Sequence, residues 1–588
     1  MLTKPTIRVL YVDLASDKVR VEERDDLFHL LGGTGVAAAL LEENMKADAD
    51  PLDPAQPIVF AIGPMTMIYP VVTKTIATFI SPLTGEYGES HAGGRLAYSL
   101  RHAGYDALVI TGKAAGPAYL SIQDNRIEVR DAGPLWGADV AEAGRLMRGM
   151  HASPGHRSIM RIGPAGENGV RYANVNVETY RHFGRLGLGT LFGAKKLKGV
   201  LTIGTHHWPI KNARAYRQAY DEIHQRVIST AAMEKYHELG TPVNVNPLNA
   251  VGALPTRNLQ STRFEHAPDI SGEAFGEHDL MYKRACAGCP IGCIHIALLR
   301  QQFGAENEYE IQSSYVSYDY EPIYAFGSML GIGTRDGALR LMEAADRLGM
   351  DAMESGVVLA WATEAMDKGI LSEKDLGVRL SFGDANGYFK ALHLISEGAN
   401  ETARLLGLGA VQASRHFGAE DLSFTAGGAQ GVAGYHTGYA NIIGHHVGSR
   451  HSHLDNAGYS LDQKQRNLSD EETVDKLIAE ECERDFVTSL AICLFARAIY
   501  DRETVRKALA TIDIQVSDED IQRTGREIYA TKLRIKQKLG YDPTKVKLPK
   551  RIFETTSMNG PISPARVDNM LQIYRERCAA LLAEFVKT

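Results

Sequence analysis

Three of the chain's six cysteines lie within eight residues, in the spacing Cys-x2-Cys-x3-Cys at Cys286, Cys289 and Cys293. Dense cysteines usually form disulfides in small secreted domains, but a chain of 588 residues can bury hydrophobic cores without them. Clustered thiols in a long chain are typical of a metal centre in a reducing compartment. Because such a centre needs a fourth ligand, the fold has to bring another part of the chain back to residues 286–293.

The identity of the fourth ligand separates the kinds of centre that these thiols could form. A structural zinc site could use His295, but this histidine follows Cys293 by only two residues, which is close for zinc-finger spacing. An iron–sulfur cluster commonly combines three neighbouring thiolates with one distant cysteine. The remaining interpretation is three unrelated cysteines, which rarely cluster between turn residues such as Pro290 and Gly292.

Three other cysteines could supply the distant thiolate. Cys482 lies in an acidic run, which is unfavourable for a cluster that already carries negative charge. Cys578, near the C-terminus, resembles an ordinary cysteine on a helix face. Cys493 lies in the apolar segment TSLAICLFARAIY and would be buried. We therefore expect Cys493 to complete a [4Fe–4S] site with the three clustered thiols.

The hydrophobic pattern changes along the chain. Residues 1–205 contain short apolar or alternating runs such as PIVFAIG and ALVITGK between glycine-rich turns, which predict strands. From about residue 211 apolar residues recur at three- and four-residue steps, which predicts helices. We expect an α+β protein with a β-rich domain at 1–208 and two mainly α-helical domains at 209–417 and 418–588.

Composition excludes several other classes of protein. A net charge of −7 argues against nucleic-acid binding, which usually needs a basic face. No apolar run is long enough for a membrane span. The N-terminal stretch MLTKPTIRVLYVDLAS lacks the apolar core of a secretion signal. Together with the clustered thiols, these features predict a cytoplasmic protein that uses a metal centre.

Several long motifs resemble the tungsten-containing aldehyde:ferredoxin oxidoreductase family. The cysteine pattern, with a lone cysteine about two hundred residues further on, is one of them. The others are SPLTGEYGESHAGGRLAYSLRHAGYDALVITGKA (81–114), RIGPAGENGVRYANVNVETYRHFGRLGLGTLFGAKKLKGV (161–200), YEPIYAFGSMLG (320–331) and DRLGMD (346–351). They follow the family's order and cover most of the chain.

The resemblance implies a large cofactor. One tungsten, or molybdenum, would be held between two pterins, with Mg²⁺ bridging their phosphates and one [4Fe–4S] cluster close by. The β-rich domain would cover one face of this bis-pterin cofactor, and the two helical domains would enclose the rest. The implied cluster ligands are Cys286, Cys289, Cys293 and Cys493, and the implied cofactor-binding residues are Lys74, His91, Ala92, Gly93, Arg185, Leu186, Gly187, Asp346, Gly349, Met350, Asp351, Thr488 and Ile492.

Elementary chemistry is compatible with these assignments but does not require them. Arg185 offers a planar fork of donors that suits a phosphate or a pterin edge, although it could equally form a surface ion pair. Asp346 and Asp351 flank Gly349 in an apolar helical pattern, where buried carboxylates would need donors such as pterin N–H groups. The alternative is that the two aspartates cap a helix.

For catalysis, the resemblance implies oxidation of an aldehyde to a carboxylic acid. Glu321 follows an aromatic run and would take a proton, and burial would raise its pKa. His453, in a segment rich in histidines, would hydrogen-bond the carbonyl oxygen, with His446 and His451 as alternates. Electrons would leave through the cluster to ferredoxin or to an iron–sulfur partner subunit, in a homodimer or a hetero-oligomer.

The chain also departs from the family's pattern. Where the family has a second Asp-x-x-Gly-x-Cys motif, this chain has Thr488 and Ala491 at the Asp and Gly positions, with Asp485 nearby. Lys74 stands where an arginine is usual. These differences keep two alternatives open. One is a catalytic subunit of a benzoyl-CoA or acyl-CoA type reductase, and the other is a cluster-bearing subunit without catalysis.

Overall fold

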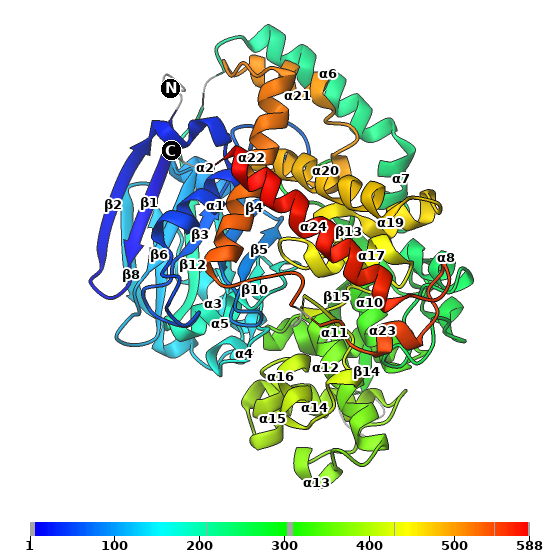
Figure 1. Cartoon of the computed structure of the whole chain (residues 1–588). Coiled ribbons are helices and arrows are strands. Elements are labelled where there is room, and N and C mark those ends of the chain that lie inside the picture. Colours follow the sequence, from blue (N-terminus) through cyan, green and yellow to red (C-terminus); the bar gives the residue numbers. More distant parts are fainter. Residues whose placement is uncertain (1–5, 209, 303–309, 428–429, 546, 586–588) are drawn as a thin grey trace.

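The computed structural model of the protein describes residues 6–208, 210–302, 310–427, 430–545 and 547–585 (Figure 1). Within these ranges, the N-terminal part forms two six-stranded sheets with the strand orders β2-β1-β6-β3-β4-β5 and β11-β10-β9-β12-β7-β8. The strands of the first sheet are β1 Ile7–Asp13, β2 Lys18–Arg24, β3 Ile58–Ala61, β4 Thr75–Ile80, β5 Tyr87–Ala92 and β6 Ala107–Thr111. Those of the second are β7 Ala118–Gln123, β8 Arg126–Asp131, β9 His156–Arg161, β10 Val175–Val177, β11 Arg181–Phe183 and β12 Leu197–Gly204.

Strand β3 shows why the inner strands of the first sheet, such as β3 and β6, consist of continuous apolar residues. Ile58 and Phe60 contribute to the core between the two sheets, whereas Val59 and Ala61 contribute to a core on the opposite face. Side chains alternate across a strand, so a strand covered on both faces reads as a continuous apolar run. The predicted β-rich N-terminal region is confirmed.

Helices from both ends of the chain cover the outer face of the first sheet. Helix α1 (Gly33–Asn44) packs on β3 and β4, and also against α20 (Asp470–Ser489) and α22 (Asp518–Lys538). Figure 1 shows α22 passing close to this blue N-terminal part of the chain. Long-range packing therefore brings the segment that follows α20, which contains Cys493, to the β-rich part.

Residues 280–318 depart from the mainly helical expectation for this part of the chain. They form the antiparallel sheet β13-β14-β15, with β13 at Leu280–Arg284, β14 at Ile294–Gln302 and β15 at Ile311–Tyr318. The first four residues of β14, Ile294–Ala297, are all buried, so both faces of this end of the strand are covered. The cysteine cluster occupies the connection between β13 and β14.

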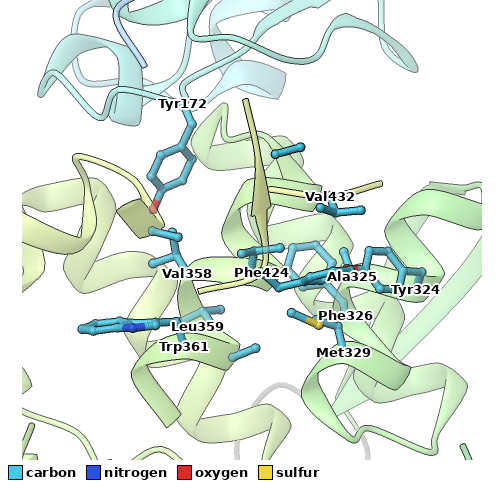
Figure 2. Close-up of a cluster of buried hydrophobic side chains, with 14 of the residues drawn as sticks. Tyr172, Tyr324, Ala325, Phe326, Met329, Val358, Leu359, Trp361, Phe424 and Val432 are labelled. Carbon is cyan, nitrogen blue, oxygen red and sulfur yellow. The ribbon is translucent and has the colours of Figure 1, made fainter. Parts of the chain in front are cut away.

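Most helices pack around one large hydrophobic core. Its helices include α10 Tyr320–Phe326, α11 Arg335–Leu348, α12 Ala352–Asp367, α14 Ala385–Glu397, α17 Tyr439–Val447, α20, α22 and α24 Pro564–Glu584. The core contains side chains from both of the predicted helical domains, as Figure 2 shows for Phe326, Trp361 and Phe424. The domain borders at 208 and 417 stay a prediction, since the two helical segments share this core.

Trp361 makes the stability of this core testable. Its side chain is fully buried in α12, and its Nε1–H donates to the carbonyl of Ala419 at 3.2 Å. We expect Trp361→Ala to lower the free energy of unfolding by about 3–5 kcal/mol because it leaves a large cavity. Denaturant unfolding followed by circular dichroism would measure the change, and Ile370→Ala, at a partly exposed side chain, is the matched control.

None of the helices in the described part of the chain is both long and apolar enough to cross a lipid bilayer.

Candidate active site

The cysteine loop and the segment around Cys493 meet through a third segment of the chain. The backbone N–H of Val71 donates to the carbonyl of Gly288 at 3.2 Å, and the carbonyl of Val71 accepts from the N–H of Cys493 at 3.1 Å. Burial, with smaller effects from Cys493 and the other two cysteines, raises the pKa of Cys289 to about 12. The structure therefore brings Cys493 to the loop. Cys482 and Cys578 instead lie in the helical core.

Four free thiols in one neighbourhood suit an iron–sulfur cluster better than a zinc ion. The imidazole Nε2 of His295 contacts the carbonyls of His237 and Glu238, so this ring is already engaged. Among the residues that the structure describes, no three His, Cys, Asp or Glu side chains converge tightly enough to hold a single metal ion. A cluster is larger than one ion and is held by thiolates spread around it.

Arg181 is a buried cation beside the thiols. Burial lowers its pKa, but the interactions with Cys286, Cys293, Asp319 and Cys493 together outweigh that effect and raise it overall. Its Nε has no hydrogen-bond partner within the described ranges. Asp319, which also interacts with Arg181, has its pKa raised to about 7 by burial and by the charge of Glu321. Sequence reasoning missed both residues, although Arg181 lies within the motif at 161–200 and Asp319 directly precedes the motif at 320–331.

Two predicted cofactor residues, Lys74 and Gly93, lie at the edge of the cysteine loop. The N–H of Lys74 donates to the carbonyl of Ala491 at 3.1 Å. A Cβ atom added to Gly93 would lie 2.5 Å from the sulfur of Cys286 and 3.7 Å from Nζ of Lys74. The absence of a side chain at Gly93 thus leaves room for the thiol. The neighbouring Ala92 ends strand β5 and is buried between the sheets.

We expect Gly93→Ala to lower the iron content of the protein by at least half. The added methyl group would displace the Cys286 thiol, because contacts below 3.0 Å are not tolerated. Iron analysis of anaerobically purified protein would measure the effect. Gly149→Ala is the control, since a Cβ there meets nothing within 4 Å. Full iron occupancy in Gly93→Ala would contradict the placement of a cluster at this loop.

Arg185 and Asp351 form a buried pair. Nε of Arg185 lies 3.2 Å from Oδ2 of Asp351, and an Nη2–H donates to the carbonyl of Gly431 at 2.7 Å. Asp351 also caps α12, because its Oδ1 accepts from the N–H groups of Met353 and Glu354. Helix capping, the alternative considered for this aspartate, therefore occurs, and the ion pair considered for Arg185 is made with the same side chain.

The residues next to Arg185 and Asp351 position these two side chains. Leu186 and Gly187 have φ values of 69° and 82°, and a Cβ at Gly187 would lie 2.1 Å from the carbonyl oxygen of Arg171. Gly349, with φ of 77°, ends α11, and Met350 pairs with Ala173 in an isolated β-bridge. These contacts join the β-rich part to the helices at the site.

Asp346 differs from Asp351 in its surroundings. Its carboxylate is 30 % exposed and lies 3.0 Å from Nε2 of His182. The apolar helical pattern predicted burial of both aspartates, with helix capping as the alternative, but α11 places Asp346 near the protein surface. The two carboxylates of DRLGMD are therefore not equivalent.

The segment TSLAIC (488–493), in which this chain differs from the family's pattern, packs tightly against the glycine-rich loop around Gly33. The hydroxyl of Thr34 donates to that of Thr488 at 2.9 Å, and the Thr488 hydroxyl donates to the carbonyl of Arg484 at 2.9 Å. A Cβ at Gly33 would lie 2.1 Å from the carbonyl oxygen of Thr488. Ile492 is buried in the core on the outer face of the first sheet. Thr488 thus makes structural contacts within the chain.

A buried charge network lies beside His91 and Asp485. Glu89 contacts Nε2 of His91 at 2.7 Å, Nη1 of Arg450 at 3.3 Å and Nζ of Lys532 at 2.8 Å. Lys532 also contacts Oδ1 of Asp485 at 2.6 Å. Burial and the charge of Arg450 lower the pKa of His91 to about 4, so His91 is neutral. Oδ2 of Asp485 has no partner among the described residues.

Glu321 and His453, predicted as the catalytic pair, lie side by side. Oε1 of Glu321, in the first turn of α10, is 3.1 Å from Nε2 of His453, the first residue of α18 (His453–Asn456). Burial raises the pKa of Glu321. Burial, followed by the charge of Arg185, lowers the pKa of His453 to about 3. The imidazole is therefore neutral near pH 7, and the pair can exchange a proton.

The alternate histidines have other contacts. Nε2 of His451 lies 3.0 Å from Oε2 of Glu86, and the carbonyl of His446 accepts from Nδ1 of His451 at 3.0 Å and from the hydroxyl of Tyr541 at 3.2 Å. A different histidine, His445, has its ring centroid 6.2 Å from that of His453. Sequence reasoning did not select His445, and its only signal was the local density of histidines.

Buried polar atoms without partners occur on several residues of this part of the molecule and also elsewhere in the described chain. Among the described residues, several buried side-chain nitrogen and oxygen atoms have no hydrogen-bond partner. Such atoms call for a physical explanation, and a bound water, ion or cofactor is one. They include the hydroxyls of Tyr172 and Tyr324, Oδ1 of Asn174, Asn176 and Asn441, Nε2 of His445 and Nδ1 of His453. This donor and acceptor set fits a large polar cofactor such as a bis-pterin.

The comparisons with known proteins point to one family over most of the chain. Residues 9–204 match the model of the aldehyde ferredoxin oxidoreductase N-terminal domain, and residues 218–578 match the model of domains 2 and 3 of the same family. The tungsten-containing aldehyde ferredoxin oxidoreductases of Thermococcus kodakarensis and Pyrococcus furiosus are 31 % and 30 % identical to it, each over 94 % of this chain and 92 % of the relative.

Two further proteins are similar to this chain, one in sequence over part of its length and one in fold over nearly all of it. The WOR-like subunit of aliphatic sulfonate oxidoreductase from Pyrococcus furiosus is 30 % identical over 66 % of this chain and 64 % of its own. The solved active-site complex BamBC of benzoyl coenzyme A reductase, with bound 1,5-dienoyl-CoA, superposes with a TM-score of 0.82 over 97 % of this chain and 94 % of that chain. At 18 % identity, the second likeness concerns the fold alone.

Proposed function

Because the chain belongs to the aldehyde ferredoxin oxidoreductase family, we propose that it oxidises an aldehyde to a carboxylic acid and passes the electrons through a [4Fe–4S] cluster to ferredoxin or an iron–sulfur partner subunit. The observation that carries this proposal is the 3.1 Å contact between the buried His453 and Glu321, whose side chain is 18 % exposed. A neutral imidazole beside a carboxyl group of raised pKa is suited to moving protons near neutral pH. We place this activity in the cytoplasm, where thiols stay reduced.

Family membership supports a tungsten–pterin cofactor. Molybdenum would be the alternative metal, and Mg²⁺ would be a further ion of the cofactor. The unpartnered buried atoms near Arg185 support a polar group of this size. Arg185, Leu186, Gly187 and Asp351 would hold the pterins. Lys74 and Gly93 would lie between pterin and cluster. Cys286, Cys289, Cys293 and Cys493 would ligate the cluster.

Glu321 and His453 would carry the protons of the reaction. With Glu321 ionised, Nε2–H of His453 donates to the carboxylate, and Nδ1 is left as an acceptor without a partner in the described ranges. A hydroxyl of the hydrated aldehyde would donate to Nδ1. As the acid forms, the substrate proton passes to Nδ1 and the Nε2 proton passes to Glu321.

The reaction converts an aldehyde and water to a carboxylic acid, two protons and two electrons. The cofactor, when bound, supplies the two-electron oxidation. An oxidised iron–sulfur protein is the terminal acceptor. Such a partner is compatible with a homodimer that meets ferredoxin or with a hetero-oligomer, and the WOR-like relative is itself described as a subunit.

A reductase acting on an aromatic acyl-CoA is the second candidate. It is favoured by the extent of the fold likeness to the benzoyl coenzyme A reductase complex, which covers 97 % of this chain. A cluster-bearing subunit without catalysis is the third, and the Thr488 contacts within the chain favour it. The joint presence of Arg185, Asp351 and the Glu321–His453 pair favours the first proposal over the third.

Metal analysis combined with activity would test the proposed function. Anaerobically purified protein should contain one tungsten or molybdenum and about four iron atoms per chain, as one cubane cluster requires. It should reduce a viologen dye when an aldehyde is the electron donor. It should not reduce the dye when the donor is a dienoyl-CoA, the compound bound in the benzoyl coenzyme A reductase complex. Iron without tungsten or molybdenum, from cells supplied with both, would support the non-catalytic alternative instead.

A further inference from the structure

Arg181 lies on a short edge strand next to the cysteine loop. This strand, β11, pairs with β10, and Arg181 stands opposite Val177. Side chains alternate across a strand, so Arg181 and Phe183 point to the same face of β11. Phe183 is fully buried in the core between the two sheets, which anchors this face of the strand. The tertiary structure thus fixes where the Arg181 side chain starts.

The stem of Arg181 packs on the same two glycines as the cysteine loop. A Cβ atom added to Gly93 would lie 2.5 Å from Sγ of Cys286 and 3.4 Å from Cδ of Arg181. A Cβ atom added to Gly94 would lie 3.8 Å from Cγ of Arg181. The N–H of Ala287, in the cysteine loop, donates to the carbonyl of Gly94 at 3.0 Å. The arginine stem and the first thiol of the loop are therefore held against one piece of backbone.

The guanidinium group of Arg181 has unused hydrogen-bonding capacity. Its Nε is buried, and no residue that the structure describes forms a hydrogen bond or an ion pair with this side chain. An arginine carries five N–H donors, and burying such a cation is costly unless it is paired. The groups that act on it electrostatically are Cys286, Cys293, Asp319 and Cys493.

Two other buried arginines show the usual arrangement. Nε of Arg450 lies 2.5 Å from Oδ1 of Asp455, and Nη1 of Arg551 lies 2.6 Å from Oε2 of Glu364. Proteins rarely bury an arginine without such a partner. Since three of the four groups that act on Arg181 are thiols, its missing partner points to a negatively charged group bound at the cysteine loop.

We propose that Arg181 sets the reduction potential of the cluster at this loop, with its N–H groups donating to sulfur atoms and its charge favouring the reduced form. Hydrogen bonds to the sulfurs and the local net charge are known to tune the potentials of iron–sulfur clusters. A cluster gains one negative charge when it takes up an electron, so a fixed cation stabilises the reduced form more than the oxidised form. The inference rests on the cluster of the proposed function and not on its substrate.

Asp319 opposes the effect of Arg181. Its side-chain Oδ1 accepts from the N–H of Tyr320 at 3.1 Å, which caps helix α10. The carboxylate lies close enough to act on both Arg181 and Cys293. A negative charge at this place disfavours the addition of an electron to the cluster. Removal of this charge and removal of the Arg181 charge should therefore shift the potential in opposite directions.

Arg181→Gln is expected to make the midpoint potential of the cluster about 59 mV more negative, which is a tenfold shift of a one-electron equilibrium. Potentiometric titration of the full-length protein under anaerobic conditions would measure it, with the electron paramagnetic resonance signal of the reduced cluster as the readout. Arg181→Lys keeps the charge and loses the planar fork of donors, so we expect a smaller shift in the same direction, about threefold.

Arg284→Gln is the matched control. Arg284 precedes Cys286 by two residues but is exposed, and its guanidinium carbon lies 4.6 Å from the ring centroid of Tyr282. Water and salt screen an exposed charge, so this variant should shift the equilibrium by less than about twofold. Asp319→Asn should shift it by about threefold in favour of the reduced form, and asparagine keeps the helix cap.

The outcomes decide the inference separately from the proposed function. Equal shifts in Arg181→Gln and Arg284→Gln, with iron retained in both, would overturn it. If Arg181→Gln retains too little iron for titration, opposite shifts in Arg181→Lys and Asp319→Asn would support the inference, and any other result would overturn it. The expected shifts in a protein that oxidises no aldehyde would support the role of Arg181 and contradict the proposed function.

Discussion

Replacing Cys493 with alanine is expected to abolish electron transfer from aldehyde to a viologen dye and to lower iron from about four atoms per chain to three or fewer, since a cubane cluster uses four protein ligands. The reason is geometric. The N–H of Cys493 donates to the carbonyl of Val71, and the N–H of Val71 donates to the carbonyl of Gly288 in the cysteine loop. Cys482 and Cys578 lie in the helical core instead, so we do not expect them to replace it. Iron analysis and the electron paramagnetic resonance spectrum of the reduced protein would measure the loss.

Cys578→Ala is the matched control for this experiment. Cys578 is a free cysteine that is 7 % exposed in the helical core, away from the loop. The control variant should keep its iron and its spectrum, whatever small change in stability follows from the lost thiol. An unaltered cluster in Cys493→Ala, or a lost cluster in Cys578→Ala, would show that the fourth ligand had been assigned wrongly.

Replacing Glu321 with glutamine is expected to lower kcat by about 10²–10⁴, the range typical of a lost general base, with little change in KM. Glutamine keeps the shape of the side chain and can still contact Nε2 of His453, but it cannot accept a proton. Metal and iron contents should stay at wild-type levels. Steady-state kinetics with a dye acceptor would measure the effect, and Glu397→Gln, at an exposed position on α14, is the control.

The pH profile gives a second readout for Glu321. The base has to be ionised, so wild-type kcat should fall as the pH drops through the pKa of Glu321, which burial raises above its ordinary value. The His453 ring stays neutral down to a pH of about 3 and adds no step in this window. Glu321→Gln should lose the acid limb of the profile. A variant with wild-type kcat and an unchanged profile would exclude Glu321 as the base.

Local patterns in the sequence predicted the β-rich part well. Strands such as β3 and β6 are buried on both faces, so they read as apolar runs in the sequence alone. The sheet at 280–318 was missed, because its strands follow helical segments and the alternation in IHIALLRQQ is short. The long motifs also predicted the family, which the comparisons confirm.

Residue types and spacing thus determined the α+β class, the family and the three clustered thiols. Only the tertiary structure decided which distant residues join them. The packing of α20 and α22 against α1 brings Cys493 to the cysteine loop, and the turn before α18 brings His453, rather than His451, to Glu321. Long-range packing brings these residues into contact, and burial shifts the pKa values of Glu321 and His453. The sequence offered Cys493, Glu321 and His453 as candidates, but the distances between them depend on long-range packing, which no local pattern contains.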